Sequence, residues 1–446
     1  MKRIFIVIVL LTVISNYSMA TTEDNLHWFK DAKFGLFIHW GLYSQTAGEW
    51  KGHPTEGGEH FMLYERIPLK EYATIAKDFN PVKFDAKKWV RAAKHAGMKY
   101  LVYTTKHHDG FCMFDSQYTD FSISRCAFKE HPKADVAKYV FEAFRKEGFM
   151  TGAYFSKPDW HNQDYWWDYF ATPNRNVNYK IERHPEKWEA FKTYTHNQIG
   201  ELMSNYGTID ILWLDGGWVS PRNNQDIDMP QIAAMARAKQ PGLLVVDRTI
   251  HGKYENYQTP EQKIPEHQLP YPWESCVTLT TDWGWVKNPV YKTPNRIISI
   301  LMEVVAKGGN LLLGVGPTAE GLIEQPTVKR LQEIGRWMQK NGKAIYHTRI
   351  TPNYHCGNVW FTADKNGRTL YALYALPEGE TLPAVIEWEG NVPERGTSVR
   401  LLSTGQRMKW IERDGKVAVT LPAKLAGSTE PIALQFDTSL PKQNKK

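Results

Sequence analysis

Short apolar runs and amphipathic segments alternate along the first three quarters of the chain. The apolar runs have the length and continuity of strands buried on both faces, and they lie at 34–41, 98–105, 150–155, 209–214, 243–246 and 310–315. Helical periodicity occupies the segments 25–33, 70–79, 87–96, 134–147, 185–205, 229–239, 296–306 and 326–342. Strands and helices that alternate in this way form a parallel sheet with right-handed crossovers. We therefore expect at least six parallel strands, with one or two more still to be located.

Each predicted strand ends in polar or aromatic residues, among them His39, His107, Asp215 and Arg248. A (β/α)8-like TIM barrel explains this recurrence, because its active site is assembled from the carboxyl ends of the strands. A doubly wound open sheet is the alternative architecture. It would gather ligands at one crevice and usually carries a glycine-rich phosphate-binding turn, which this sequence lacks. We predict an α/β catalytic barrel over residues 21–343.

The pattern changes near residue 346, where alternating apolar and polar positions replace helical periodicity. Short strands are predicted at 359–362, 370–375, 384–388, 398–402, 416–421 and 432–436, with Gly, Pro and Asp turns between them and no helix. This pattern predicts a C-terminal antiparallel β-sandwich over 344–440, followed by a basic tail at 441–446. For this second domain we favour a packing role over sugar binding.

The first twenty residues have the pattern of a secretory signal peptide. Lys2 and Arg3 precede an apolar run at 4–14, and Ser18-Met19-Ala20 forms a small-residue cleavage site. The run is too short to span a bilayer, and no later run is long enough. No cysteine follows it as a lipoprotein anchor. We expect an exported protein without a membrane anchor, periplasmic or secreted after cleavage near Ala20.

Charge and cysteine spacing exclude several other classes of protein. The formal charge of +7 falls to 7 − 2 = +5 when Lys2 and Arg3 are removed, and the remaining basic residues are scattered among 48 acidic ones, so no nucleic-acid footprint is present. The four cysteines are too widely spaced for a disulfide framework or a zinc site. We expect free thiols, although export would permit a Cys112–Cys126 bridge.

Asp215 is the first candidate for chemistry. It ends the apolar run at 209–214 and is followed by Gly216 and Gly217, with Trp213 and Trp218 on either side. Aromatic walls suit the faces of sugars, and glycines let a ligand approach the backbone. The 17 tryptophans and 22 tyrosines of the chain fit a carbohydrate cleft, although a large core explains many of them. The residue is a catalytic aspartate or, with equal weight from this stretch alone, the cap of a turn.

A glycosidic bond is usually cleaved by two carboxyl groups, so a partner for Asp215 is needed. Glu49, Glu266 and Glu274 are acidic residues near predicted strand ends or aromatic residues. The segment 251–272 is predicted to be a loop that leads into Trp273-Glu274 at the top of the barrel. A neighbouring tryptophan would raise the pKa of Glu274 toward that of a general acid. Spacing alone leaves the three glutamates as alternatives.

The histidines of Lys106-His107-His108-Asp109, together with His39, allow a metal-binding interpretation. Adjacent residues of a strand point to opposite faces, and the usual HxH or HExxH spacing is missing. We therefore predict no metal and expect these histidines to bind substrate hydroxyl groups or to be structural. Arg248 would hold a ring hydroxyl or the nucleophile, or would form an ordinary salt bridge. No nucleophile elbow and no P-loop occurs.

Several long motifs occur together, and they cover nearly all of residues 25–440. They are Trp28-Phe29, Lys33-Phe34-Gly35-Leu36-Phe37-Ile38-His39-Trp40-Gly41, Gly48-Glu49-Trp50, Lys106-His107-His108-Asp109-Gly110-Phe111, Leu212-Trp213-Leu214-Asp215-Gly216, Pro272-Trp273-Glu274-Ser275-Cys276, and Gly309-Asn310-Leu311-Leu312-Leu313 with Gly316-Pro317. In these motifs the chain resembles the α-L-fucosidases of glycoside hydrolase family 29.

The resemblance implies a retaining exo-α-L-fucosidase that removes terminal fucose from glycans through a covalent fucosyl-enzyme, without a cofactor. It implies Asp215 as nucleophile and Glu274 as acid/base, with Glu49 as the reserve candidate. The residues implied to bind substrate are His39, Glu49, Trp50, His107, His108, Tyr154, Trp213 and Arg248. A related sugar such as an α-galactoside and an inactive sugar-binding protein are the alternatives. Glycan linkage and oligomeric state stay open.

Overall fold

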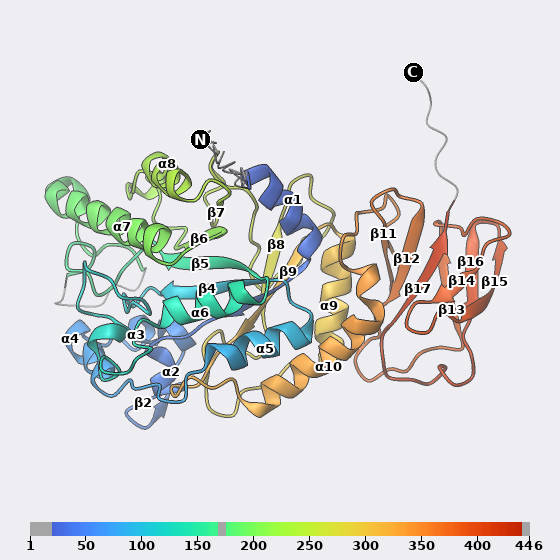
Figure 1. The fold of residues 1–446 in the computed structure, drawn as a ribbon, viewed down its shortest axis with the longest axis horizontal. Helices are drawn as coiled ribbons and strands as arrows, with labels where there is room; N and C mark the ends of the chain where they lie inside the picture. Colours follow the sequence, from blue (N-terminus) through green and yellow to red (C-terminus); the bar gives the residue numbers. More distant parts are fainter. Residues whose placement is uncertain (1–19, 168–174, 439–446) are drawn as a thin grey trace, which may run out of the picture.

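Seven parallel strands form a curled sheet in the larger part of the molecule (Figure 1). The computed structural model describes residues 20–167 and 175–438, so the predicted signal peptide, apart from Ala20, and the predicted basic tail lie outside it. The strand order is β7-β6-β5-β4-β1-β9-β8. The strands are β1 (Phe34–Ile38), β4 (Tyr100–Lys106), β5 (Met150–Ser156), β6 (Ile211–Asp215), β7 (Leu244–Asp247), β8 (Glu274–Thr278) and β9 (Asn310–Val315).

An irregular segment fills the gap between the edge strands β7 and β8. Asn256 N donates a hydrogen bond to Val245 O of β7 at 2.8 Å, and Gln262 N donates to Cys276 O of β8 at 2.8 Å. Pro260 lies between these two contacts and has no N–H to continue a ladder. The predicted barrel is therefore confirmed as seven regular strands, and the segment 256–262 completes the ring between β7 and β8.

Most helices cover the outer face of the sheet and connect its strands, whereas the first helix packs Phe29 and Ala32 into the cluster inside the sheet's curve. Among them, α5 begins at the N-cap Asp85, whose side chain accepts from Lys87 N at 3.0 Å, and it ends at Gly97 with φ 85°. The helices are α1 (Thr22–Ala32), α5 (Ala86–Ala96), α6 (Val136–Lys146), α7 (Pro185–Asn205), α8 (Met229–Lys239), α9 (Pro294–Ala306) and α10 (Gln325–Asn341). Shorter elements follow β1, namely α2 (Tyr43–Thr46), β2 (Glu49–Trp50), β3 (His53–Pro54), α3 (Phe61–Tyr64) and α4 (Leu69–Tyr72).

Alternate residues of each strand point to opposite faces, and this alternation sets the orientation of the site. In β6, Leu212 and Leu214 pack in the large core shared with the helices, whereas Trp213 packs in the separate cluster inside the sheet's curve. Asp215 lies two residues after Trp213 and so faces the same interior. Tyr154 of β5 belongs to the interior cluster as well.

The C-terminal part is a separate antiparallel sheet with its own core, as predicted. Its strands are β10 (His355–Cys356), β11 (Val359–Ala363), β12 (Thr369–Tyr374), β13 (Val385–Glu389), β14 (Val399–Leu401), β15 (Arg407–Arg413), β16 (Lys416–Thr420) and β17 (Ile432–Asp437), in the order β10-β11-β12-β17-β14-β15-β16-β13. The first residues of β15 pair with β14 and the later ones with β16, so the sheet turns at β15. Residues from both halves, including Phe361 and Trp388, form one core.

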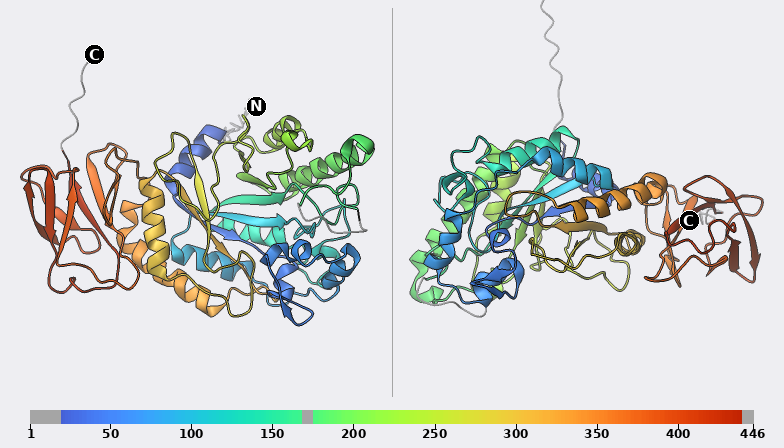
Figure 2. Two further views of the ribbon diagram at one scale, coloured as in Figure 1. Left: turned by 180° about the vertical axis from the view of Figure 1, so that it is seen from behind. Right: turned by 90° about the horizontal axis from the view of Figure 1, so that it is seen from below.

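Helices α9 and α10 lie between the parallel sheet and the antiparallel domain (Figures 1 and 2). Trp337 of α10 donates a hydrogen bond from Nε1 to Pro431 O at 2.8 Å. Tyr371, Leu373 and Ala433 of the second domain belong to the core of the first. These buried contacts favour a packing role for the antiparallel domain.

All four cysteines are free, including Cys112 and Cys126. Within the described residues, no helix has both the length and the apolar character needed to cross a bilayer.

One strand of the parallel sheet differs from the sequence-based prediction. We expected the residues around Glu274 to end a loop, but they begin β8. Glu274 pairs in register with Asn310, which begins β9. Only Cys276 and Val277 are apolar in β8, so its pattern is too short to distinguish a strand from a loop.

Candidate active site

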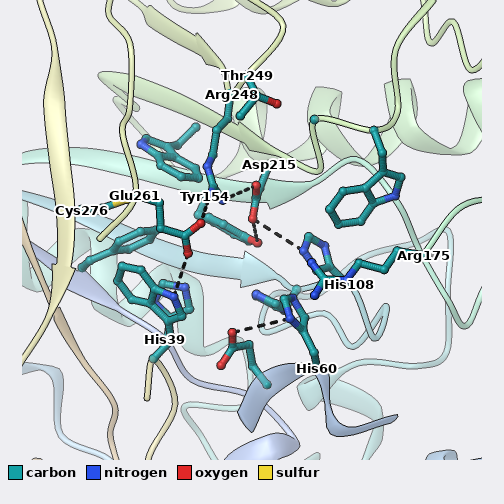
Figure 3. Close-up of a pocket in the computed structure, with 17 residues that line it drawn as sticks. His39, His60, His108, Tyr154, Arg175, Asp215, Arg248, Thr249, Glu261 and Cys276 are labelled. Atoms are coloured by element: carbon teal, nitrogen blue, oxygen red, sulfur yellow. Dashed lines mark hydrogen bonds and ion pairs between the residues drawn. The ribbon is translucent and has the colours of Figure 1, made fainter. Parts of the chain in front are cut away.

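A pocket opens at the carboxyl ends of the parallel strands, where a TIM barrel places its active site (Figure 3). Its volume is about 160 Å³, which is below the usual range of about 300–1,000 Å³ for drug-sized ligands. The pocket therefore suits a small ligand. It is lined by Phe37, His39, Glu59, His60, His107, His108, Tyr154, Arg175, Trp213, Asp215, Gly217, Trp218, Arg248, Thr249, Glu261, Cys276 and Trp283.

Asp215 is the most strongly stabilised carboxylate in this pocket. Its Oδ1 accepts hydrogen bonds from Arg248 Nη1 and from Gly216 N, both at 2.7 Å, and its Oδ2 accepts from Tyr154 Oη at 2.7 Å. Burial alone would raise the pKa of Asp215, but the Arg248 charge and these hydrogen bonds outweigh burial and hold the pKa well below its usual range. The side chain is therefore ionised at neutral pH.

Four imidazole rings surround this carboxylate. Burial lowers the pKa of His39 and that of His107 to about 3, and it also lowers the pKa values of His60 and His108. Neutral imidazoles carry one donor and one acceptor each, as sugar hydroxyl groups require. Within the described residues, His39 Nδ1, His107 Nδ1 and His60 Nε2 are buried and have no hydrogen-bond partner. These atoms are available to a polar ligand.

The tautomer of His108 follows from its neighbours. Ser156 Oγ donates to Pro158 O at 2.5 Å, so it accepts from the Nδ1–H of His108 at 2.7 Å. The Nε2 atom of His108 therefore bears a lone pair, and it lies 3.7 Å from Asp215 Oδ2. A hydroxyl group that approaches this nitrogen can donate a hydrogen bond to it.

Aromatic side chains form the apolar part of the pocket. Trp213 stacks on Tyr154 with ring centroids 5.4 Å apart, and Phe37 packs against both rings. Trp283 stacks on His39 at 4.7 Å. The pocket thus combines hydrogen-bonding groups with apolar walls, as the binding of a sugar with both hydroxyl and methyl substituents requires.

Glu261 is the second carboxylate that lines the pocket near Asp215. Arg248 donates to Asp215 through Nη1 and to Glu261 through Nη2, so one guanidinium bridges the two carboxylates (Figure 3). Trp283 Nε1 donates to Glu261 Oε1 at 3.0 Å. The Glu261 side chain is 36% exposed, whereas that of Asp215 is 9% exposed. Glu261 therefore reaches solvent at the edge of the pocket.

The structure contradicts the placement of Glu274 at the top of the barrel. Glu274 is the first residue of β8, is fully buried and does not line the pocket. Its carboxyl group accepts hydrogen bonds from Tyr100 Oη at 2.6 Å and from Trp213 Nε1 at 3.2 Å. Burial raises the pKa of Glu274 to about 7. The predicted pKa increase is present, but the carboxyl group lies beneath Trp213 and has no access to a substrate.

The other predicted glutamates also lie away from the pocket. Glu49 forms an ion pair with Lys287 at 2.6 Å and is 47% exposed, and the Glu266 side chain is 89% exposed. Trp50 packs against Phe61 and does not line the pocket either. The substrate-binding roles expected of Glu49 and Trp50 are therefore wrong for this geometry, because the turn that carries them extends outward as the β2–β3 hairpin.

Glu59 and His60 occupy the pocket wall instead of Glu49 and Trp50. They lie in the same long segment after β1, and burial raises the pKa of Glu59 to about 8. Besides these two, the pocket contains five residues that were not predicted from the sequence to belong to the site, namely Arg175, Thr249, Glu261, Cys276 and Trp283. Glu261 follows Pro260 in a stretch with no strand pattern. Only its position along the chain, between a strand that ends in an aspartate and Trp283, could have indicated that Glu261 belongs to the site.

His60, His107 and His108 form a group whose possible ligand atoms all lie within 4.8 Å of one another. A metal ion binds an imidazole in the plane of the ring, and His60 and His108 stack with only 14° between their planes. The two stacked rings cannot both direct a lone pair at one ion without rotating. The absence of a metal remains a prediction.

Comparison with known proteins identifies the family. The family model for α-L-fucosidase matches residues 14–343. The plasma α-L-fucosidase of Pongo abelii is 30% identical over 434 residues, which cover 89% of this chain and 86% of that protein. The tissue α-L-fucosidase of Mus musculus is 29% identical over 449 residues, which cover 94% of this chain and 92% of that protein.

Solved structures agree with the sequence comparison. α-L-Fucosidase isoenzyme 1 from Paenibacillus thiaminolyticus is 32% identical with a TM-score of 0.78, over 94% of this chain and 99% of that one. A glycoside hydrolase family 29 α-L-fucosidase from Bacteroides thetaiotaomicron is 27% identical with a TM-score of 0.80, over 94% of this chain and 96% of that one. The chain belongs to the α-L-fucosidase family, glycoside hydrolase family 29.

Proposed function

We propose that the protein is a retaining α-L-fucosidase in which Asp215 is the nucleophile and Glu261 the acid/base. The observation that carries this assignment is the single guanidinium of Arg248 that contacts both carboxylates. Two carboxylates on one guanidinium lie close to each other, which is consistent with the short separation of retaining glycosidases, about 5–5.5 Å. A relative from Bacteroides thetaiotaomicron, 27% identical, has been trapped as a covalent intermediate with 2-fluoro-fucosyl fluoride, which supports the same mechanism.

In the first step, Asp215 attacks the anomeric carbon while Glu261 gives its proton to the glycosidic oxygen, and the leaving group departs as an alcohol. Asp215 Oδ1 already accepts two hydrogen bonds, whereas Oδ2 accepts one, from Tyr154. We therefore assign the attack to Oδ2, which keeps a free lone pair. In the second step, Glu261 takes a proton from water, and the resulting hydroxide attacks the anomeric carbon and releases Asp215.

The remaining residues of the pocket bind the sugar. The unpaired nitrogens of His39, His60 and His107 meet ring hydroxyl groups. The rings of Phe37 and Trp213 supply apolar surface for the C5 methyl group of fucose. Glu274 keeps Trp213 in place by accepting its Nε1–H.

Azide products distinguish the two catalytic roles. Asp215→Gly with azide should yield β-fucosyl azide, because azide then attacks the substrate directly from the face that Asp215 occupied. Glu261→Ala with azide should yield α-fucosyl azide, because azide attacks the fucosyl-enzyme in place of water. Glu274→Gln is the matched control and should respond to azide with neither product. Formation of α-fucosyl azide by Glu274→Gln, or its absence with Glu261→Ala, would contradict the assignment of Glu261 as the acid/base.

We also propose that the protein is exported. Residues 1–20 support this, since they combine Lys2 and Arg3 with an apolar run and a small-residue cleavage site. Expression of the full chain in a bacterial host, followed by cell fractionation and N-terminal sequencing, should give a periplasmic or secreted protein that begins at Thr21. A cytoplasmic protein that retains Met1 would contradict the proposal.

A further inference from the structure

Arg175 is a second arginine in the pocket, and it enters from the side opposite Glu261 (Figure 3). Its guanidinium lies over the rings of Tyr64 and Trp218, with distances of 5.4 and 5.7 Å to the ring centroids. One of its terminal nitrogens donates a hydrogen bond to Tyr64 Oη. Tyr64 is 46% exposed, so these contacts place Arg175 at the mouth of the pocket.

No carboxylate of the described residues forms an ion pair with Arg175, whereas Arg248 contacts two carboxylates. A partly buried cation without a counter-ion is unfavourable unless a ligand supplies the opposite charge. A guanidinium also presents a planar set of donors that matches sulfate and carboxylate groups. The chemistry of the mouth therefore suits an anion.

The backbone of Arg175 is held by the same aromatic cluster. Tyr165 Oη donates to Arg175 O at 3.2 Å and accepts from Trp218 Nε1 at 3.2 Å. Arg175 itself has φ 65°, an uncommon conformation for a residue with a side chain. Such support fixes the guanidinium before a ligand arrives, which reduces the entropy lost on binding.

Among the described residues that line the pocket, none supplies a negative charge that matches Arg175 during the first chemical step. Asp215 is balanced by Arg248, and the four imidazoles are neutral. Glu59 is mostly uncharged at pH 7, because burial raises its pKa to about 8. When Glu261 carries the proton that it delivers, the positive charge of Arg175 has no partner among these groups.

We infer that Arg175 binds an anionic group, a sulfate or a carboxylate, on the part of the substrate that leaves, so that the protein prefers fucosides of anionic glycans. The inference rests on the proposed function. The leaving group must pass through the mouth, because the small interior is filled by the fucose unit. Arg175 and Glu261 flank this exit from opposite sides.

The test compares aryl α-L-fucosides that differ in charge but little in shape. We would measure kcat/KM for the 3-carboxyphenyl and 3-carbamoylphenyl fucosides and take the ratio of the two values. This ratio should be about 5-fold greater for the wild-type protein than for Arg175→Met. A 5-fold change corresponds to the free energy that a partly exposed ion pair contributes. Comparing ratios between proteins cancels the difference in leaving-group acidity. Arg222→Met removes an exposed arginine outside the pocket and should keep the wild-type ratio.

A further substrate and a change of salt concentration test the inference independently. A 3-sulfophenyl fucoside carries a sulfonate, whose three oxygens stand in for those of a sulfate group, and it is compared with the carboxylate. A preference for either anion that is lost in Arg175→Met supports the inference. High salt should reduce the wild-type preference, which tests the charge without any variant. Equal ratios in the wild type and Arg175→Met, or an equal loss in Arg222→Met, would overturn the inference. If the wild type fails to hydrolyse the uncharged carbamoyl substrate at all, the proposed function itself is wrong.

Discussion

Glu274 gives the sharpest prediction about stability, because its carboxyl group is fully buried and the part of the chain that the structure describes places no cation beside it. Its carboxylate accepts hydrogen bonds only from the uncharged donors of Tyr100 and Trp213 within the described residues. In Glu274→Gln, the amide oxygen can accept from Trp213 Nε1, and the amide nitrogen can donate to Tyr100 Oη. The glutamine thus reproduces the protonated carboxyl group and cannot ionise.

The size of the effect follows from the pKa of Glu274, which burial raises from an ordinary 4.5 to about 7. A raised carboxyl pKa means that the folded protein holds the proton more tightly than the unfolded chain does. Stability is therefore lost as pH rises from about 4.5 to about 7, and it does not change further above that. The loss is under about 1 kcal/mol at pH 5 and about 3 kcal/mol at pH 8.

We expect Glu274→Gln to be more stable than the wild type at pH 8, with a smaller difference at pH 5. Urea unfolding at the two pH values, followed by tryptophan fluorescence and circular dichroism, measures this difference. Glu266→Gln is the control, because the Glu266 side chain is 89% exposed and should change stability at neither pH. A difference between Glu274→Gln and wild type that is the same at both pH values would refute the reasoning.

Three further predictions concern the pocket and the second domain. Tyr154→Phe removes a 2.7 Å hydrogen bond to Asp215 and should lower kcat by about 10-fold or more in steady-state kinetics, while an unchanged kcat would contradict its role. An aryl α-L-galactoside adds a hydroxyl group at C6 and should react about 10–100-fold more slowly than the fucoside, because the rings of Phe37 and Trp213 offer that group no hydrogen-bond partner. Equal kcat/KM values for the two substrates would favour the galactoside alternative. Trp388→Ala leaves a cavity in the core of the antiparallel domain and should lower the free energy of unfolding, measured in urea, by about 3–5 kcal/mol while kcat is retained. A decrease below about 1 kcal/mol would contradict the role of Trp388 in that core.

The residues that the sequence could identify are those that directly follow a continuous apolar strand. His39, Asp215 and Arg248 each lie within two residues of the end of such a run, so strand polarity alone placed them at one edge of the sheet. Alternation then put Trp213 and Asp215 on the same face. Long helices such as α7 (Pro185–Asn205) were equally predictable, because their periodicity extends over many turns.

The residues that the sequence analysis missed lie where no local pattern exists. Glu261 is in the irregular segment that fills the barrel between β7 and β8, and its position depends on hydrogen bonds to strands that are distant in the chain. Glu274 begins a strand that has only two apolar residues. The sequence pattern therefore could not show at which end of the barrel Glu274 lies. Glu49 and Glu59 lie in one loop, and only the folded hairpin decides which of them faces the pocket.

The identity of the nucleophile is tested most directly by labelling. The Glu261→Gln variant, incubated with 2-deoxy-2-fluoro-α-L-fucosyl fluoride, should gain the mass of one fluorofucosyl group, because the fluorine slows breakdown of the intermediate and the variant lacks the base that activates water. Peptide mapping by mass spectrometry should place the label on Asp215, and Asp215→Asn should remain unlabelled. A label on any other residue, or stable labelling of Asp215→Asn, would contradict the account.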